Sequence, residues 1–227
     1  MASDSQATAT PGGSLSQAYK VTAQKLFHFA ELSVFGATGP VGVIQNIHES
    51  LSQIHRGSIA ERRESDVRRT LKNAIYPIQQ EAFKGWVQQA GGSPAVICLL
   101  CGYCKSGPWI IEIDANGGDQ SYTDAGFHAI GSGEQGAVLV HAALAHYGVV
   151  SRTALQAQLI AYRVMDAAIS TIGFGVGHPI VIWKVSEAGI QVLTKEEIDG
   201  IRDTVSTWLE AEADTLPSII TQSNPRA

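Results

Sequence analysis

Three cysteines lie close together in the middle of the chain, and their spacing is that of a cluster-binding loop. Cys98, Cys101 and Cys104 follow the pattern C-x2-C-x2-C, and they are the only cysteines in the sequence. An iron–sulfur cluster needs a fourth thiolate. The surrounding residues are apolar and typical of a strand, in which alternate side chains point to opposite faces. We therefore predict buried structural cysteines, with Cys98 and Cys104 on one face and Cys101 on the other, and no metal site.

A glycine-rich turn, residues 34–42 (VFGATGPVG), could bind the pyrophosphate of a dinucleotide. An apolar strand pattern precedes the turn and a helical pattern follows it, so backbone amides at the helix start could meet a phosphate. The dinucleotide motif also needs a second parallel strand after the helix. Residues 57–64 (GSIAERRE) do not provide one. A tight strand-to-helix turn explains the small residues, and an NAD(P)-binding reductase that uses Gly36–Gly42 is a remote alternative.

Charge and composition exclude several classes of function. Of the 227 residues, 44% are hydrophobic and only 16% are charged, and the net charge is −5. An acidic chain has no overall electrostatic attraction for nucleic acid or for an anionic membrane. No apolar run reaches the roughly 20 residues of a membrane span, and the first residues do not resemble a signal peptide. We expect a cytoplasmic protein without a cofactor, with one domain over residues 1–213 and a flexible tail over 214–227.

The hydrophobic periodicity predicts groups of strands that are separated by pairs of helices. Such an order does not fit the regular alternation of single strands and single helices in a parallel sheet. It predicts an α+β fold, a four-layer αββα sandwich of two antiparallel sheets flanked by helix pairs. The predicted strands cover residues 3–8, 20–29, 32–38, 95–103, 109–114, 127–130, 179–185 and 190–193, and the predicted helices cover residues 43–54, 67–89, 134–146, 155–169 and 194–208.

Two local signals refine the predicted helices. Pro77 lies inside the helical pattern of residues 67–89, where it is expected to kink the helix or to start a new one. Thr194 and Glu197 have the spacing of a capping box, which predicts the start of the last helix.

Four segments, taken in this order, resemble the proteasome beta-type family of N-terminal-nucleophile hydrolases. They are residues 2–8 (ASDSQAT), 23–27 (AQKLF), 111–118 (IEIDANGG) and 129–133 (AIGSG). Each segment alone is weakly specific, but together they cover the chain from residue 2 to about residue 210 with the expected elements between them. The resemblance implies the same four-layer αββα fold.

The resemblance also implies threonine-type peptidase chemistry. In active members the nucleophile is a threonine at the mature N-terminus, and its own α-amino group can serve as the base. Asp4 and Lys25 match the family's aspartate and active-site lysine, and Ser132 matches the serine that hydrogen-bonds near the amine. Thr8 and Ala37 match positions that border an extended substrate, although the family usually has glycine where Ala37 stands.

The family's nucleophile has no counterpart in these residues. The match begins within the family's second strand, and removal of Met1 would expose Ala2, which has no nucleophilic side chain. Thr171 and Phe174 stand where the family usually supplies an aspartate and a serine around the amine. Two explanations are open. Either the true start lies upstream at a nucleophile, or the chain is a non-catalytic assembly subunit.

The expected partners follow from the same resemblance. We expect copies of the chain to form a ring or a related oligomer that encloses peptidase sites. Peptides or unfolded proteins would be the substrates, and an unfoldase would be a further partner. The low charge and high apolar content agree with buried subunit faces. The reaction would be amide-bond hydrolysis by a chain that carries the nucleophile.

Overall fold

A computed structural model describes residues 1–9, 19–86, 95–149, 153–172 and 175–223 of the chain. Every strand pair in these ranges is antiparallel, so the predicted α+β class with antiparallel sheets is confirmed. The strands are β1 (Ala2–Asp4), β2 (Gln6–Ala9), β3 (Tyr19–Thr22), β4 (Leu26–Phe29), β5 (Ser33–Thr38), β6 (Ile97–Cys104), β7 (Gly107–Ile113), β8 (Asp119–Ser121), β9 (Ile180–Ser186) and β10 (Gly189–Val192). The helices are α1 (Val41–Ser52), α2 (Gly57–Ala60), α3 (Glu64–Trp86), α4 (Glu134–His146), α5 (Ala154–Thr171) and α6 (Lys195–Ser223).

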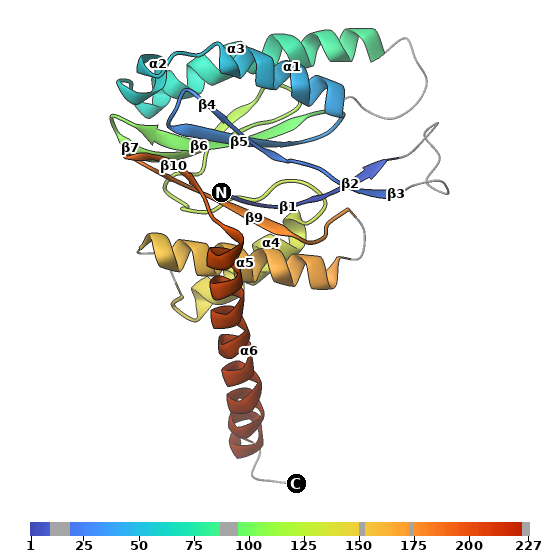
Figure 1. The fold of residues 1–227 in the computed structure, drawn as a ribbon, viewed down its shortest axis with the longest axis vertical. Helices are drawn as coiled ribbons and strands as arrows, with labels where there is room; N and C mark the ends of the chain where they lie inside the picture. The colour runs from blue at the N-terminus through green and yellow to red at the C-terminus, as the bar shows by residue number, and fades with distance from the viewer. Residues whose placement is uncertain (10–18, 87–94, 150–152, 173–174, 224–227) are drawn as a thin grey trace.

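The larger sheet has five strands in the order β4-β5-β6-β7-β8, and helices α1, α2 and α3 cover one of its faces (Figure 1). Alternate residues of its strands point to this face, as the period of two requires. They meet apolar side chains from the three helices and form the main core of the protein. The fully buried members include Ile47, Leu51, Ile59, Leu71, Ile75, Leu100, Trp109, Ile111 and Ile113.

The smaller sheet has three strands in the order β1-β9-β10, and it packs against helices α5 and α6. Tyr162 of α5, Ile182 of β9 and Val205 of α6 are buried together there. A separate cluster of Leu26, Val34 and Trp183 joins this sheet to the five-stranded one. Strands β2 and β3 form a two-stranded antiparallel pair. Asp4 at the end of β1 also lies near the five-stranded sheet, since its side chain contacts Lys25, the residue before β4.

Helix α6 is the longest element, with 29 residues and a length of about 43 Å at 1.5 Å per residue. Its first half packs on α5 through Ile201 and Val205, whereas its C-terminal half projects away from the body (Figure 1). Residues 214–223, which were expected to belong to a flexible tail, continue this helix. No helix within the described ranges combines the length and the apolar composition needed to cross a bilayer.

The structure corrects several of the predicted elements. The predicted strand of residues 3–8 is divided between β1 and β2, and that of residues 20–29 between β3 and β4, so that their parts lie in different sheets. Residues 127–130 are irregular rather than a strand, and β8 forms the edge of the sheet beside β7. Pro77 lies inside α3 and does not start a new helix. The backbone carbonyl that loses its helical donor belongs to Asn73, which is exposed to water.

Two helices begin at capping boxes. At α6 the predicted pair is confirmed, because the Thr194 amide donates to the Glu197 carboxylate at 2.7 Å and the Glu197 amide donates to the Thr194 hydroxyl at 3.2 Å. At α5 a second box was not predicted, in which Thr153 and Gln156 exchange the same two bonds at 3.1 and 3.2 Å. Each box satisfies two backbone N–H donors that the start of the helix leaves open.

Replacement of Thr153 by alanine is expected to destabilise the protein by about 1 kcal/mol, because the first turn of α5 loses its N-cap acceptor. Urea unfolding followed by circular dichroism measures the change. Thr207→Ala is the matched control, since Thr207 is exposed in the middle of α6 and alanine is a better helix former there. Equal losses in the two variants would show that the Thr153 cap contributes nothing specific.

Candidate active site

An ion pair between Asp4 and Lys25 forms the centre of the candidate site. Lys25 Nζ donates to Asp4 Oδ1 at 2.7 Å, and the side chains are 26% and 9% exposed, respectively. Asp4 ends β1, and Lys25 directly precedes β4, so the pair connects the edges of the two sheets. An ion pair that is this buried has a high desolvation cost and is weak evidence for a purely stabilising role.

The second oxygen of Asp4 fixes the pair to the segment before β9. Asp4 Oδ2 accepts a hydrogen bond from the Gly177 amide at 3.2 Å, and the Ser5 amide donates to the Gly177 carbonyl at 3.2 Å. Thus both carboxylate oxygens of Asp4 have donors. A carboxylate held in this way keeps a neighbouring ammonium group in one place.

Ser132 lies next to the same segment. A Cβ atom placed on Gly175 would come within 2.7 Å of Ser132 Oγ, so this close approach depends on glycine at position 175. Gly175 also has a φ of +83°, in the left-handed region that favours glycine. Since Gly177 is two residues farther on, the segment 175–177 joins Ser132 to the Asp4–Lys25 pair.

The end of β5 completes this side of the site. A Cβ atom on Gly36 would lie 3.2 Å from the Lys25 carbonyl oxygen, so Gly36 lets β5 pass close to the start of β4. Gly131, with a φ of +91°, approaches the side chain of Thr38 at the last residue of β5. The candidate site is therefore bounded by β1, the start of β4, the end of β5, the turn before α4 and the segment before β9.

Not all of the predicted site residues lie near the Asp4–Lys25 pair. The structure brings Asp4 and Lys25 together and places Ser132 beside the segment that binds Asp4. Thr8 lies in β2 opposite Lys20 of β3. Ala37 is half-buried and packs against the main core on the face of the sheet that the helices cover.

The structure describes one of the two positions at which the sequence departs from the family pattern. Thr171 ends α5, where its exposed hydroxyl donates to the Ala167 carbonyl at 2.7 Å. Phe174 lies outside the described residues. Thus the Thr171 hydroxyl is bonded to carbonyls of its own helix.

The cysteines lie on the two faces of β6 as predicted, although Cys101 is only partly buried. Cys98 and Cys104 are buried in the main core, whereas Cys101 packs in the cluster between the two sheets. All three are free thiols. In the described part of the chain, no three His, Cys, Asp or Glu side chains are arranged to hold a metal ion.

We expect the cysteines to resist alkylation in the folded protein. Burial raises the pKa of the Cys98 thiol to about 12 and also raises the pKa of Cys101. At pH 8, a pKa of about 12 leaves only about one Cys98 thiol in 10⁴ ionised, and the thiolate is the reactive form. Intact-mass measurement after iodoacetamide treatment should show no adduct at pH 8, whereas all of the cysteines should be labelled in concentrated guanidinium chloride. Rapid labelling of the folded protein would refute the prediction.

The glycine-rich turn does not belong to a dinucleotide-binding fold. Strand β5 pairs antiparallel with both β4 and β6, so α1 does not connect two parallel strands. Instead, Gly39 has a φ of +137°, and a Cβ atom there would come within 2.5 Å of the Ala95 carbonyl oxygen. The small residues allow a tight turn beside β6. The reductase alternative thereby loses its structural basis.

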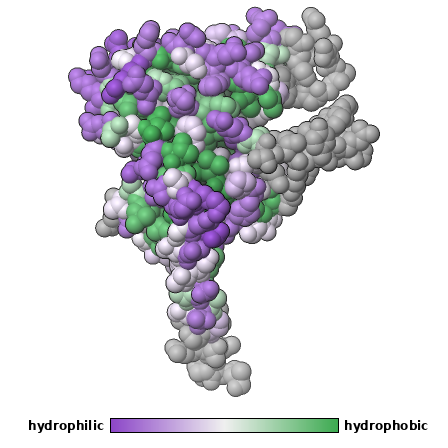
Figure 2. Space-filling model, in the orientation of Figure 1, coloured by the Kyte–Doolittle hydropathy of each residue, from purple (hydrophilic) through white to green (hydrophobic). Residues whose placement is uncertain are grey.

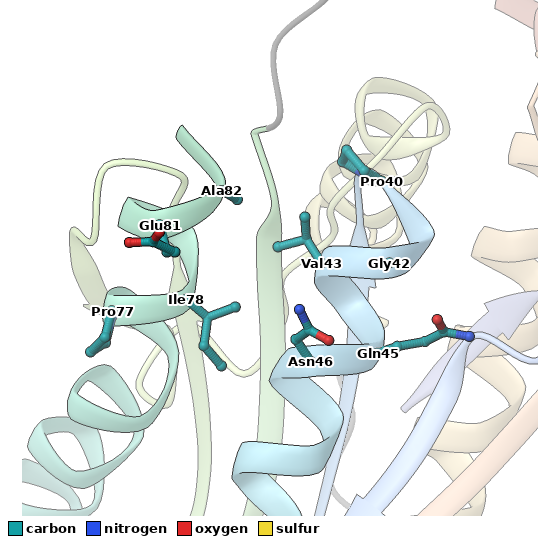
Figure 3. Close-up of a pocket in the computed structure, with 9 residues that line it drawn as sticks. All are labelled: Pro40, Gly42, Val43, Gln45, Asn46, Pro77, Ile78, Glu81 and Ala82. Carbon is teal, nitrogen blue, oxygen red and sulfur yellow. The ribbon is translucent and has the colours of Figure 1, made fainter. Parts of the chain in front are cut away.

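A groove of about 690 Å³ lies between α1 and α3. In Figure 3, Val43 of α1 and Ile78 of α3 project toward each other across it. The described residues that line the groove include no serine, threonine, cysteine, lysine or histidine, so they offer no nucleophile and no base apart from a carboxylate. These lining residues are Pro40, Gly42, Val43, Gln45, Asn46, Pro77, Ile78, Glu81 and Ala82.

Sequence reasoning missed a carboxylate–histidine pair on the inner side of the five-stranded sheet. The Glu112 carboxylate of β7 shares a hydrogen bond with His128 Nε2. One signal could have revealed it, because Glu112 interrupts the apolar run of residues 109–113 (WIIEI). An acidic residue at a half-buried strand position needs a partner.

Comparisons with known proteins identify the fold. No family model matches the chain, and no curated protein matches it. Among solved structures, the chain is similar to Anbu (ancestral beta-subunit) from Yersinia bercovieri, with a TM-score of 0.68 and 18% identity over 97% of this chain and 91% of that one. It is also similar to an Anbu (Gly-1) mutant from Hyphomicrobium sp. strain MC1, with a TM-score of 0.68 and 17% identity over 95% and 90%.

These likenesses show that the chain has the proteasome-like fold of the Anbu beta-subunits. They also correct the resemblance described above. The assignment to the proteasome beta-type family is wrong, because the similar structures are Anbu proteins, a distinct family with a proteasome-like fold, and no family model supports the assignment.

Proposed function

We propose that this protein is a peptidase subunit that hydrolyses amide bonds with an N-terminal nucleophile. The observation that carries the proposal is the Asp4–Lys25 ion pair. The Gly177 amide binds Asp4, and the nearby Gly175 lies against Ser132. The fold supports it, since the similar structures are beta-subunits. We further propose that the two sheets lie face to face between helix pairs, as a four-layer αββα sandwich.

The chemistry follows from the position of the Lys25 ammonium. A positive charge favours the ionised form of a nearby hydroxyl or thiol and the neutral form of a nearby amine. The proposed nucleophile is a threonine, serine or cysteine that opens a segment preceding β1. Its α-amino group would take the side-chain proton as the oxygen or sulfur attacks the carbonyl carbon, and would then give a proton to the leaving amine. Water would hydrolyse the resulting acyl-enzyme.

Ser132 has the second role in this proposal. Its hydroxyl lies beside Gly175 at the turn that leads into α4. A hydroxyl can both donate and accept, so it can orient an α-amino group in its neutral and protonated forms. Asp4 would hold Lys25 and would not react itself.

A non-catalytic subunit of the same fold is the second candidate. One observation favours it. Within the described ranges, only the Asp4 carboxylate accepts a hydrogen bond from Lys25 Nζ, and no hydroxyl or thiol bonds to this ammonium group. In that case the Asp4–Lys25 pair would join the two sheets and would have no chemical task.

We also propose that the protein assembles with copies of itself. Several large apolar side chains are exposed on and near α4, among them Leu139, Tyr147 and Leu155, which are 71%, 75% and 62% exposed. Hydrophobic residues also gather across the middle of the face in Figure 2, below the polar surface of α1 and α3. Exposed apolar patches of this kind mark interaction surfaces. Such an assembly could enclose the sites and restrict access to unfolded or short substrates.

Peptide hydrolysis by the protein purified from its native host tests the proposed function. Fluorogenic peptides of several sequences would be incubated with the protein, and its N-terminal residue would be determined in the same sample. Turnover together with an N-terminal threonine, serine or cysteine supports the peptidase. No turnover together with a start at Met1 or Ala2 contradicts it and leaves the non-catalytic subunit.

A further inference from the structure

The segment between β8 and the turn before α4 carries the candidate site residue Ser132, but no backbone ladder holds it. Residues 127–130 are irregular, and no backbone hydrogen bond to another described residue fixes them. The turn that follows is ordered by two bonds, from the Glu134 amide to the Gly131 carbonyl at 3.0 Å and from the Ala137 amide to the Gly133 carbonyl at 2.9 Å. Side chains must therefore place this turn relative to the sheet.

His128 provides the polar link. Its Nε2 hydrogen-bonds to the Glu112 carboxylate in β7, and the two side chains are 12% and 18% exposed, respectively. Its ring lies parallel to the Tyr122 ring, with centroids 3.6 Å apart and an interplanar angle of 7°. Ser132 follows only one short stretch of chain after His128. A fixed ring at position 128 therefore limits where the turn can go.

Tyr122 is itself anchored to the same strand. Its amide donates to the Ile110 carbonyl at 2.8 Å, and the Ile110 amide donates to the Thr123 hydroxyl at 3.0 Å. Burial, together with the charges of Glu112 and Glu134, raises the pKa of the Tyr122 hydroxyl. The phenol therefore stays neutral and offers a stable surface on which the His128 ring can stack.

The residue before His128 is held from the opposite side. The Phe127 ring stacks on His141 of α4, with centroids 3.8 Å apart and an interplanar angle of 4°. Burial lowers the pKa of His141, which favours the neutral ring in this stack. Thus Phe127 fixes the segment to α4, whereas His128 fixes it to the sheet.

We propose that His128, held by Glu112 and Tyr122, is a positioning residue that sets the Gly131–Ser132 turn beside Gly175. The proposal rests on the proposed function in one respect, namely that the turn belongs to the peptidase site. Removal of one member of the Glu112–His128 pair leaves a buried carboxylate or a buried ring without its partner and releases the turn from β7. In this proposal Glu112 and His128 position the turn and take no part in bond making.

Hydrogen exchange of the full-length protein tests the placement without any use of activity. We expect the Glu134 amide, which donates to Gly131, and the Ala137 amide, which donates to Gly133, to exchange at least about tenfold faster in His128→Ala and in Glu112→Ala than in the wild type. Glu112→Gln should restore most of the protection, because its amide oxygen still accepts from an imidazole N–H. Glu31→Ala is the matched control, since it breaks the exposed Glu31–Arg56 pair on another part of the surface.

Unchanged exchange of the Glu134 and Ala137 amides in both alanine variants would overturn the proposal. An equal rise in β6 and in the rest of α4 would also overturn it, because general loosening would then explain the effect. If His128→Ala does not fold, the exchange rates of Glu112→Ala and Glu112→Gln alone test the proposal. In a protein that hydrolyses peptides, both alanine variants should lower kcat about tenfold with KM changed less than about twofold. If the wild type hydrolyses nothing, the proposed function fails and the exchange result still stands.

Discussion

Replacement of Lys25 by methionine is expected to lower peptide hydrolysis by about 10²–10³-fold, the range typical for removal of one group that acts by electrostatic stabilisation. Methionine keeps much of the length of the lysine stem but removes the ammonium group that bonds Asp4 at 2.7 Å. The nucleophile and its amine would then lose the positive charge that favours their reactive forms. Single-turnover and steady-state assays with a fluorogenic peptide measure the loss.

A folding control is needed, because Lys25→Met removes the ammonium donor of the Asp4 carboxylate and leaves the Gly177 amide on its other oxygen. Breaking a buried ion pair by removing one partner costs about 3–5 kcal/mol. The double variant Asp4→Asn with Lys25→Met removes both charges and should recover part of the stability but none of the activity. Activity in this double variant close to that of the wild type would exclude a chemical role for the pair.

Gly117→Ala is expected to destabilise the protein by about 2–5 kcal/mol, the sum of the two costs that follow. Gly117 has a φ of +77° in the turn between β7 and β8, where alanine costs about 1–2 kcal/mol. A Cβ atom there would also come within 2.2 Å of the Tyr76 ring of α3, so the helix or the turn must move. Overpacking of this kind costs about 1–3 kcal/mol more. Thermal unfolding should show a Tm lower by about 10 °C.

Two variants separate the backbone contribution from the steric one. Gly107 has a φ of +110°, and a Cβ atom there would meet no other atom within 4 Å, so Gly107→Ala should carry only the backbone cost. Tyr76→Ala removes the ring that the new methyl group of Gly117→Ala would meet, and the double variant should be less destabilised than the sum of the two single variants. Equal losses for Gly107→Ala and Gly117→Ala would show that contact with Tyr76 is unimportant.

Much of the fold could be predicted from hydrophobic periodicity. The helix at residues 134–146 and the hairpin of β9 and β10 were predicted almost to the residue, because their patterns are regular and their ends carry clear turn signals. Strand β8 was missed because its three residues, Asp-Gln-Ser, are polar and lie at a sheet edge. Residues 127–130 have an apolar pattern typical of a strand, yet the Phe127 and His128 side chains pack on α4 and β7 in place of a ladder.

The candidate site was predictable only in part. Asp4 and Lys25 are 21 residues apart, and only the resemblance to known segments suggested that they meet. No local pattern could show that Gly177 binds Asp4 or that Gly175 lies against Ser132, since these contacts join elements that are far apart in the chain. Long-range contacts of this kind depend on how the sheets pack, which periodicity does not determine.

Covalent trapping of the nucleophile tests the central claim most directly. The protein from its native host would be treated with a peptide that carries an acylating β-lactone, and its intact mass and modified residue would be determined. The peptidase proposal predicts one acyl group on an N-terminal threonine, serine or cysteine of the wild type, with slow or absent labelling of Lys25→Met. An unmodified protein that begins at Met1 or Ala2 would contradict it.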